Sequence, residues 1–560
     1  MAANAQRWRS AAERLELPAT LLILLAATLL VRPFGDFPLN DDENHAIGTW
    51  NFARDLEFRF TIGTTPPLRA QVVWGALWTW MFGESFEVLR ASTLVLAGIA
   101  LLIFNRSLLM AGVGFGLRMT ATLALLFNPI FFWSAHTYMT EVPFVCASAA
   151  AFYCFVRAVR DERTGWFIAG CCAVAISWWI RQGIVNLLPP MILLAWYRER
   201  ITVRWRRFLA IAAITGTGYV LMALLRPTLI VASTSEFYLH YKMWGEETFR
   251  IPEIATLIAS YIFFNMQHAT LFFLPLSAAA AASFRAIRER RQVIAFAILA
   301  IFLFGRMTQL VVRGAPIPYY TSVRCCEITT GNILMNLGLG PPTLPDVWGH
   351  INEYSLRFPH GGRVALSYAS VAIATVAIAL LLFAARSRFA VPRANLVFVF
   401  GASLALVGTL ALCVSGQYID RYSLDSAWSI GLLLPLVIAW NRPVARWIAG
   451  IAVMGMAVFC ILAVQEYFSW NRLRWVAFWE LRNRGVRLEE IDAGAEPFLF
   501  YEVSQARTLS ERRRMAFGPG KREYLIAFAA MPDTRVIARR SYSGWLGTHR
   551  GEVVTLQRVK

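Results

Sequence analysis

Long apolar runs recur throughout the first 464 residues and are separated by short, arginine-rich segments. A membrane-spanning helix needs about 20 mostly apolar residues, or somewhat fewer where flanking side chains snorkel to the interface. The runs that approach or meet this requirement lie at about 17–34, 88–104, 119–134, 142–156, 166–180, 184–197, 208–225, 254–281, 293–312, 364–385, 396–415, 424–440 and 447–464. The pattern predicts an all-α polytopic membrane protein with about 13 transmembrane helices.

A further apolar segment, 70–82, has only 13 residues, and the distribution of charge decides its placement. If it does not span the membrane, the arginine-rich segments, among them 198–207 and 285–291, all fall on one side. Lys and Arg favour the cytoplasmic side. We therefore expect 70–82 to be an interfacial helix on the outer face of the cell (inner) membrane, with a cytoplasmic N-terminus and an extracytoplasmic C-terminus.

The block 465–560 has the mixed composition of a soluble domain. It opens with a Trp- and Arg-rich helical stretch and continues with segments in which apolar and polar residues alternate. These candidate strands are Phe498–Val503, Tyr524–Ala529, Arg535–Arg539 and Val553–Val559. We expect a transmembrane domain over 1–464, with outer loops at 35–87, 226–253 and 313–362, and then a small α+β extracytoplasmic domain over 465–560.

The composition of the chain favours a membrane protein and argues against a nucleic-acid partner. Hydrophobic residues make up 57% of the chain and charged residues only 16%, whereas soluble domains have about 25% charged residues. The formal net charge is +19, but most arginines lie between apolar runs, where they determine topology. The Cys and His residues show no spacing typical of metal ligands, so we assign no metal site.

The outer loop after the first span contains three consecutive carboxylates, Asp41, Asp42 and Glu43. Crowding beside a membrane surface raises the pKa of some of them, which suits a general base. A fourth acid, Glu141, lies between two later spans on the same predicted face. The alternatives are a solvated acidic loop and an ordinary acidic helix start. Convergence of two acidic sites on one membrane face favours a catalytic role for Asp42, Glu43 and Glu141.

Cationic and aromatic residues on the same face are candidates for binding an anionic substrate. Arg69 begins the interfacial helix, and Arg421 and Tyr422 lie in the turn between two late spans. Two further cations, Lys242 and Arg250, lie in the second large outer loop. A guanidinium group binds phosphate through paired hydrogen bonds. The alternative for each residue is structural: a snorkelling side chain, an Asp–Arg pair or a member of an aromatic belt.

Several motifs resemble those of one group of membrane glycosyltransferases. In chain order they are Asp42-Glu43-Asn44-His45, Pro66-Pro67-Leu68 with Phe82-Gly83 and Arg90, Thr140-Glu141-Val142-Pro143, and Arg421-Tyr422. The first is similar to the Asp-Glu-x-His of protein O-mannosyltransferases and to the Asp-Glu of bacterial aminoarabinose transferases. The others are similar to the Pro-Pro-Leu…Phe-Gly…Arg, Thr-Asp-x-Pro and Arg-Tyr motifs of the same families, a type that resembles glycosyltransferase family 39. The order of the motifs and their shared outer-face placement carry the resemblance.

The resemblance implies a GT-C fold and a polyprenyl-phosphate sugar as donor. It implies inverting transfer, at the outer face, to a protein, lipid or glycan acceptor. Asp42 would deprotonate the acceptor hydroxyl, and Arg250 and Arg421 would hold the lipid phosphate. No cofactor is obligatory in this group, and the use of a divalent metal stays open. The chain departs from the pattern at Thr65, where Lys or His is frequent, and at Glu141, where Asp is commoner.

The main alternative is a transporter or flippase for a lipid-linked or small anionic substrate. Transporters place ionisable residues near the membrane midplane, often in broken helices. In this chain the centres of the predicted spans are nearly free of Asp, Glu and Lys, and the carboxylates lie at the outer ends. The sequence therefore favours an integral-membrane glycosyltransferase whose partners are the lipid-linked donor, the acceptor and membrane lipids.

Overall fold

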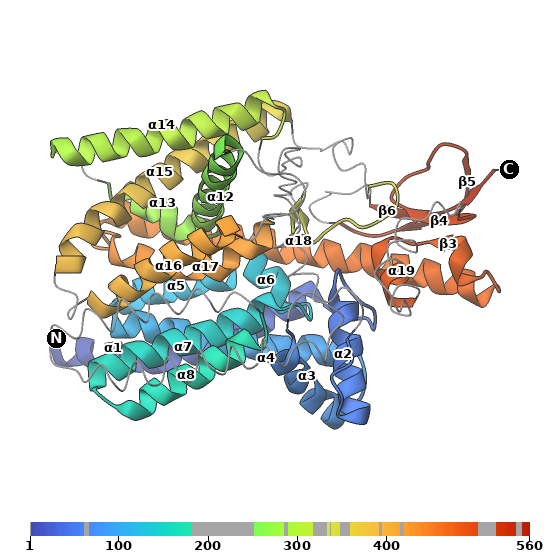
Figure 1. Cartoon of the computed structure of the whole chain (residues 1–560), viewed down its shortest axis with the longest axis horizontal. Coiled ribbons are helices and arrows are strands. Elements are labelled where there is room, and N and C mark those ends of the chain that lie inside the picture. The colour runs from blue at the N-terminus through green and yellow to red at the C-terminus, as the bar shows by residue number, and fades with distance from the viewer. Residues whose placement is uncertain are drawn as a thin grey trace.

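The computed structural model describes residues 2–60, 67–181, 251–284, 289–316, 333–335, 338–347, 359–390, 395–414, 419–501, 522–544 and 551–559. Over these residues the molecule is an elongated helical bundle, with the N-terminus at one end and a small sheet near the C-terminus at the other (Figure 1). The predicted spans 184–197 and 208–225 lie outside the described residues, as do Lys242 and Arg250.

The helices of the bundle coincide with the predicted apolar runs. They are α1 (Ala2–Val31), α4 (Phe86–Met110), α5 (Phe115–Leu126), α6 (Pro129–Ala135), α7 (Glu141–Asp161), α8 (Thr164–Trp178), α13 (Leu274–Ala282), α14 (Arg290–Val312), α15 (His360–Ala390), α16 (Leu396–Val414), α17 (Leu424–Leu433) and α18 (Pro443–Asn483). Among the described helices, five are long and apolar enough to cross a membrane, or six if the bent pair α5 and α6 is one span. The chain is a multi-pass helical membrane protein, as predicted.

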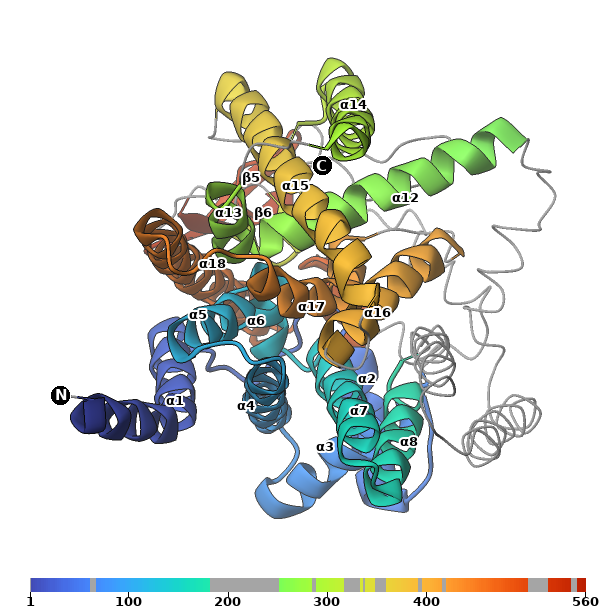
Figure 2. The ribbon, with the colours of Figure 1, turned by 90° about the vertical axis from the view of Figure 1, so that its left-hand side faces the viewer.

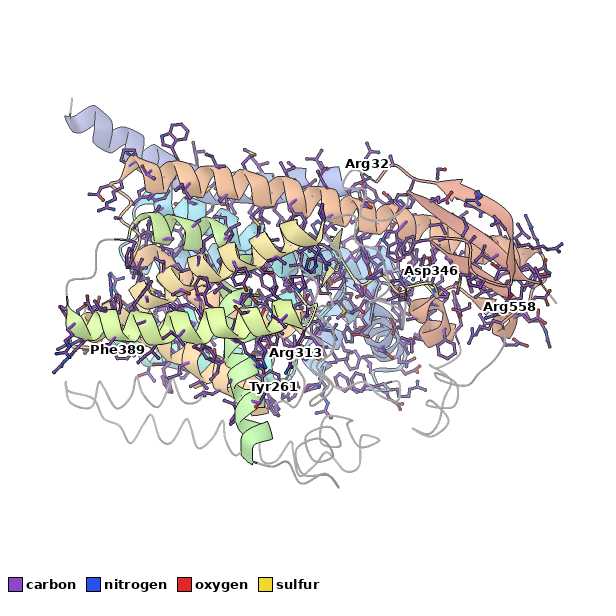
Figure 3. The ribbon with its side chains drawn as sticks, turned by 90° about the horizontal axis from the view of Figure 1, so that it is seen from above. Arg32, Tyr261, Arg313, Asp346, Phe389 and Arg558 are labelled. Atoms are coloured by element: carbon purple, nitrogen blue, oxygen red, sulfur yellow. The ribbon has the colours of Figure 1, made fainter. Side chains whose placement is uncertain are left out.

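The prediction of one continuous span over 254–281 is wrong. The segment forms α12 (Ile251–Phe272) and α13, which are separated at Phe273. Figures 2 and 3 show that α12 lies across the long axis of the bundle. Two polar side chains in α12 explain this, because Asn265 contacts Thr409 and Gln267 contacts Ser370 instead of facing lipid.

A bend between α5 and α6 precedes the turn that carries residues of the candidate site. The two helices meet at 63°. Asn128 caps α6 by accepting hydrogen bonds from the N–H groups of Ile130 and Phe131, and Pro129 occupies the first turn. The turn over residues 136–140 follows and leads directly into α7.

Two short helices, α2 (Asp42–Asp55) and α3 (Arg69–Phe82), lie across the end of the bundle and pack against each other (Figures 1 and 2). With 14 residues, α3 is too short to span a bilayer. It directs Gln71 and Val72 inward and exposes Met81 and Phe82, each 62% accessible. This amphipathic arrangement fits the expected interfacial helix.

The C-terminal domain is built on the last helix of the bundle. Helix α18 is 41 residues long and continues without a break past residue 465, where the sequence predicts a domain boundary. Beside its C-terminal half lies a four-stranded sheet with the order β3-β4-β6-β5, in which only the β3–β4 pair is parallel. The strands are β3 (Ile491–Asp492), β4 (Tyr524–Ala527), β5 (Thr534–Ser541) and β6 (Glu552–Arg558).

Three of the four predicted strands of this domain are confirmed, as β4, β5 and β6. The fourth, Phe498–Val503, is wrong, because its described part belongs to helix α19 (Ala495–Tyr501). The aromatic residues of this helix pack on α18: the ring of Tyr501 stacks on that of Phe478 at 5.7 Å. A small hairpin of β1 (Leu334–Met335) and β2 (Gly338–Leu339) and the 3-10 helices η4 (Asp420–Ser423), η5 (Leu434–Leu436) and η6 (Leu488–Glu490) complete the described elements.

Candidate active site at the end of the bundle

The acidic run of the first loop forms the start of α2. Asp41 is the N-cap residue, and Asp42 and Glu43 occupy the first turn. Carboxylates are favoured here, because the first N–H groups of a helix give its N-terminus a partial positive charge. Asp42 and Glu43 are nevertheless fully buried, whereas the side chain of Asp41 is 41% exposed. The three neighbouring acids therefore have different environments.

The two oxygens of Asp42 are treated differently. Oδ1 accepts a hydrogen bond of 3.0 Å from the backbone N–H of Tyr138. Oδ2 is buried and has no hydrogen-bond partner among the described residues. Burial raises the pKa of Asp42 from 3.8 to about 7, against the lowering effect of the Arg90 charge and the Tyr138 N–H. A carboxylate with this pKa and a free oxygen is suited to accept a proton near neutral pH.

Tyr138 holds Asp42 in place and is itself held by three side chains. Its carbonyl lies 3.1 Å from His45 Nδ1 and accepts a 2.9 Å hydrogen bond from Gln71 Nε2. Its hydroxyl donates to the carbonyl of Gln71 and lies 3.0 Å from Thr49 Oγ1. Burial lowers the pKa of His45 below 6.5, so its ring is neutral at pH 7. The histidine of the acidic motif thus fixes the turn that binds the neighbouring aspartate.

Glu43 is fully buried beside Asp42, and burial shifts its pKa in the same direction. Its Oε1 accepts a 2.8 Å hydrogen bond from Asn44, and its buried Oε2 has no partner among the described residues. Burial raises the pKa of Glu43 well above 4.5, and the charge of Asp41 adds a smaller rise. The crowding of carboxylates invoked from the sequence is thus a secondary cause of these raised pKa values. Burial thus favours the protonated form of Glu43 more than water does, and in that form the carboxyl group is a hydrogen-bond donor.

The structure brings Arg421 and Glu141 to this acidic loop. Both terminal nitrogens of Arg421 donate to Asp41 Oδ2 at 3.0 Å. Arg421 Nε also lies 3.7 Å from Glu141 Oε1. The adjacent Asp420 fixes this turn, since its carboxylate accepts hydrogen bonds from the backbone N–H groups of Ile333 and Leu334. Residues separated by almost 400 positions therefore meet at the start of α2.

Two residues that the sequence analysis does not assign to the site complete it. Arg181 donates to Glu141 Oε1 at 3.0 Å and lies 3.6 Å from Asp425. Its guanidinium carbon is 4.8 Å from the ring centroid of Tyr422, and that of Arg421 is 5.6 Å from the same ring. The sequence offered one indication of both residues, because Arg181 and Asp425 are charged side chains at the outer ends of predicted spans. Two guanidinium groups therefore lie beside one tyrosine ring and are paired with the surrounding carboxylates in a single network.

Arg69 and Arg90 have different surroundings. Arg90 is buried and donates to the backbone carbonyls of Gly35 and Phe37, so it orders the end of α1 against α4. Arg69 is partly buried at the start of α3, and its guanidinium lies 5.9 Å from the ring of Phe58. The backbone N–H of its neighbour Ala70 donates to the carbonyl of Trp179, which places α3 beside the segment that carries Arg181.

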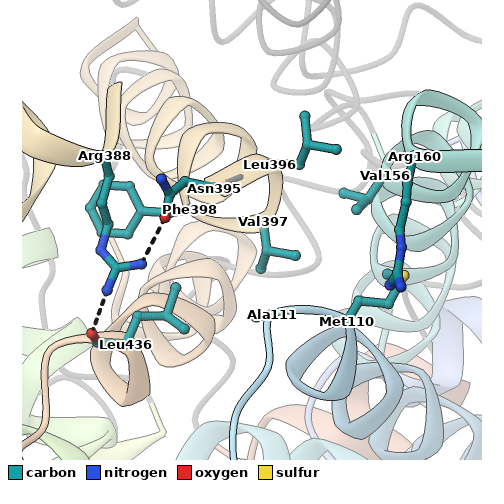
Figure 4. A pocket seen from close by; sticks show the side chains of 10 residues that line it. All are labelled: Met110, Ala111, Val156, Arg160, Arg388, Asn395, Leu396, Val397, Phe398 and Leu436. Carbon is teal, nitrogen blue, oxygen red and sulfur yellow. Dashed lines mark hydrogen bonds between the residues drawn. The ribbon is translucent and has the colours of Figure 1, made fainter. Parts of the chain in front are cut away.

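Among the described residues, no cluster of three or more His, Cys, Asp or Glu side chains has the arrangement of a metal site. A pocket of about 170 Å³ has none of the acidic residues of the site in its lining (Figure 4). Arg160, Arg388 and apolar residues line it, and Arg388 donates to Asn395 and to the carbonyl of Leu436. Figure 3 shows Phe389, the residue after the pocket residue Arg388, near one end of the molecule and Arg558 of the sheet near the other.

Comparison with known proteins gives a distant structural likeness. No family model matches the chain, and no curated protein matches it. Two crystal structures of ArnT from Cupriavidus metallidurans are similar to it, one bound to undecaprenyl phosphate and one in the apo state. Each shares 14% identity over 75% of this chain and covers 76% and 77% of the ArnT chain, with TM-scores of 0.35 and 0.34 respectively. At these TM-scores, assignment of a function rests on the residues of the site itself.

Proposed function

We propose that this chain is an integral-membrane glycosyltransferase that moves a sugar from a polyprenyl-phosphate donor to an acceptor hydroxyl at the outer face. The observation that carries the proposal is the state of Asp42. It is a fully buried carboxylate with one oxygen fixed by Tyr138, the other without a partner among the described residues, and a pKa of about 7. This is the state that a general base needs before substrate arrives.

In the proposed reaction Asp42 Oδ2 takes the proton of the acceptor hydroxyl. The acceptor oxygen forms a bond to the anomeric carbon of the sugar while the bond from that carbon to the phosphate oxygen breaks. The electron pair of the broken bond leaves with the polyprenyl phosphate. Because attack occurs opposite the leaving group, the configuration at the anomeric carbon is inverted.

The leaving phosphate requires positive charge close to the base. Arg421 and Arg181 supply two guanidinium groups within one ion-pair network. In the absence of donor they are paired with Asp41 and Glu141, so a bound phosphate would exchange for these carboxylates as the partner of the cations. Tyr422, Arg69, Lys242 and Arg250 stay candidate contacts for the donor on the predicted outer loops.

A direct test is to incubate the purified protein in detergent with a panel of polyprenyl-phosphate sugars and measure released polyprenyl phosphate. We expect release with one sugar or a small set of related sugars, and increased release when the acceptor is added. No release from any member of the panel, with or without membrane extract as acceptor source, would overturn the proposal. Movement of intact donor across vesicles without release would instead support the flippase alternative.

A further inference from the structure

One carboxylate of the C-terminal domain joins this domain to the acidic loop. Glu496, in the first turn of α19, is fully buried. Its Oε1 accepts a 3.2 Å hydrogen bond from the backbone N–H of Asn40. Its Oε2 accepts hydrogen bonds of 2.6 Å from both Arg474 Nη1 and Thr343 Oγ1. Three segments that are remote in sequence thus meet at a single side chain, directly before Asp41.

Asn40 determines how α2 begins. Its φ is 55°, in the left-handed region that Asn tolerates better than most residues. Asp41 and Asp42 follow directly, and the N–H of Asp42 donates to the carbonyl of Leu39 at 3.2 Å. The hydrogen bond from Asn40 to Glu496 therefore anchors the turn from which both carboxylates project.

Arg474 binds Glu496 but leaves two of its own buried nitrogens without a hydrogen-bond partner among the described residues. It is fully buried between the rings of Trp470 and Trp475, at 5.3 and 5.6 Å. Its Nε and Nη2 have no hydrogen-bond partner among the described residues. Replacing a buried ion pair by apolar residues of similar volume is often neutral or stabilising. The stability of the domain alone is therefore a weak reason for this pair, and its position beside the acidic loop suggests another.

We propose that Glu496, fixed by Arg474, is a positioning residue through which the C-terminal domain sets the orientation of the Asp41–Asp42 turn. The inference rests on the proposed function, because it assigns a role in placing the base of that reaction. The charge of Glu496 also contributes to raising the pKa values of Asp42 and Glu43. Removal of the carboxylate thus changes both the geometry and the titration of the base.

The test uses Glu496→Gln and the double variant Arg474→Met with Glu496→Gln in the full-length protein. The double variant avoids leaving the Arg474 charge buried without a partner. Glu480→Gln is the matched control, because Glu480 lies on α18, as Arg474 does, and pairs with Arg540 in the sheet. Turnover of the donor identified in the panel is measured across pH, together with the unfolding temperature of each variant.

We expect both Glu496 variants to lose roughly ten- to hundredfold in kcat, as small displacements of a reacting group do. Their kcat/KM profiles should move to lower pH, since a negative charge near Asp42 is removed. A loss of thermal stability with unchanged turnover and pH profile would overturn the positioning role, and so would a double variant that cannot fold. The absence of transfer in the wild-type protein would instead count against the proposed function itself.

Discussion

Two buried ion-pair networks lie towards opposite ends of the bundle and differ in how fully their carboxylates are bonded. Glu16 on α1 is 3% exposed and pairs with Arg118 on α5. Its Oε1 accepts hydrogen bonds from Asn105 at 2.6 Å and from Arg118 Nε at 3.0 Å. Its Oε2 accepts two more from Arg118. The guanidinium also donates to the carbonyl of Val113. We call this the closed network, because both oxygens of its carboxylate have hydrogen-bond partners within the protein.

The acidic cluster at the other end is an open network, in the sense that its carboxylates keep oxygens without hydrogen-bond partners among the described residues. Each of four buried carboxylates has one oxygen with no hydrogen-bond partner among the described residues: Asp42, Glu43, Glu141 and Asp425. Buried polar atoms are normally satisfied, because each unsatisfied one costs about 1–3 kcal/mol. The comparison separates two uses of buried charge. The closed network is typical of a buried ion pair that joins helices, whereas the open network is typical of a binding site whose polar atoms find their partners in a ligand.

The largest effect is expected from Asp42→Asn, which keeps the shape of the side chain but removes the proton acceptor. Turnover should fall roughly 10²–10⁴-fold, the usual contribution of a general base. Donor affinity should stay near the wild-type value. Asp41→Asn is the matched control, since Asp41 pairs with Arg421 and is 41% exposed, and it should lose far less turnover. Near-normal turnover in Asp42→Asn would refute the base assignment.

The same variant makes a prediction about pH. In the wild type, kcat/KM should rise with pH around the pKa of Asp42, about 7, and this limb should disappear in Asp42→Asn. Because burial raises the pKa of Asp42 from 3.8 to about 7, the folded state loses stability as pH rises between these two values, where the unfolded chain has released this proton and the folded protein still holds it. The stability of Asp42→Asn relative to wild type should therefore increase from pH 3.8 to about 7 and stay constant above that, as thermal unfolding at several pH values would reveal.

The sequence predicted the helices of the bundle well where contact with lipid requires an apolar segment. It failed where contacts within the protein determine the structure of a segment. Apolar runs identified the spans because each spanning helix must be apolar over its length. The segment 254–281 misled because the polar residues of α12 find partners on α15 and α16. The Phe498–Val503 segment misled because its alternation of residues reflects aromatic packing on α18 rather than strand pairing.

For the candidate site, the sequence identified chemical types better than partners. The motifs singled out Asp42, Glu141 and Arg421, and the structure brings these three into one region. The pairing of Arg421 with Asp41 rather than Asp42 depends on a one-residue difference in direction at the start of a helix. Glu496 lies more than 450 positions from Asn40, and no local pattern announces such a contact.

The second largest effect is expected from breaking the closed network. Glu16→Gln leaves the Arg118 charge buried with poorer partners, and loss of one member of such a pair costs about 3–5 kcal/mol. We expect a lower unfolding temperature and lower yield, with near-normal turnover per folded molecule. A strong loss of turnover in folded Glu16→Gln protein would show that both networks take part in function and would erase the distinction between them.

A smaller effect on binding is expected from Arg421→Ala. A charge-assisted hydrogen bond to phosphate contributes roughly 1.5–3 kcal/mol, which corresponds to about ten- to hundredfold in donor affinity. The loss should appear as a higher donor concentration at half-saturation, with a smaller change in kcat. Arg181→Ala should act in the same direction, because Arg181 shares Glu141 with Arg421. Unchanged donor saturation curves in both variants would exclude the two arginines as phosphate ligands.

The smallest effect is expected from the exposed pair at the far end of α2. Arg54 pairs with Glu84, with side chains that are 60% and 33% exposed. Exposed ion pairs contribute only about 0–1 kcal/mol, because water screens the charges and side-chain entropy opposes the contact. Arg54→Ala should therefore leave turnover, donor affinity and the pH profile unchanged, although it alters the same short helix that carries Asp42. An altered pH profile in this variant would mean that any change in α2 alters the pKa of Asp42. The effects of Asp42→Asn and Glu496→Gln could then no longer be assigned to the roles proposed for these two residues.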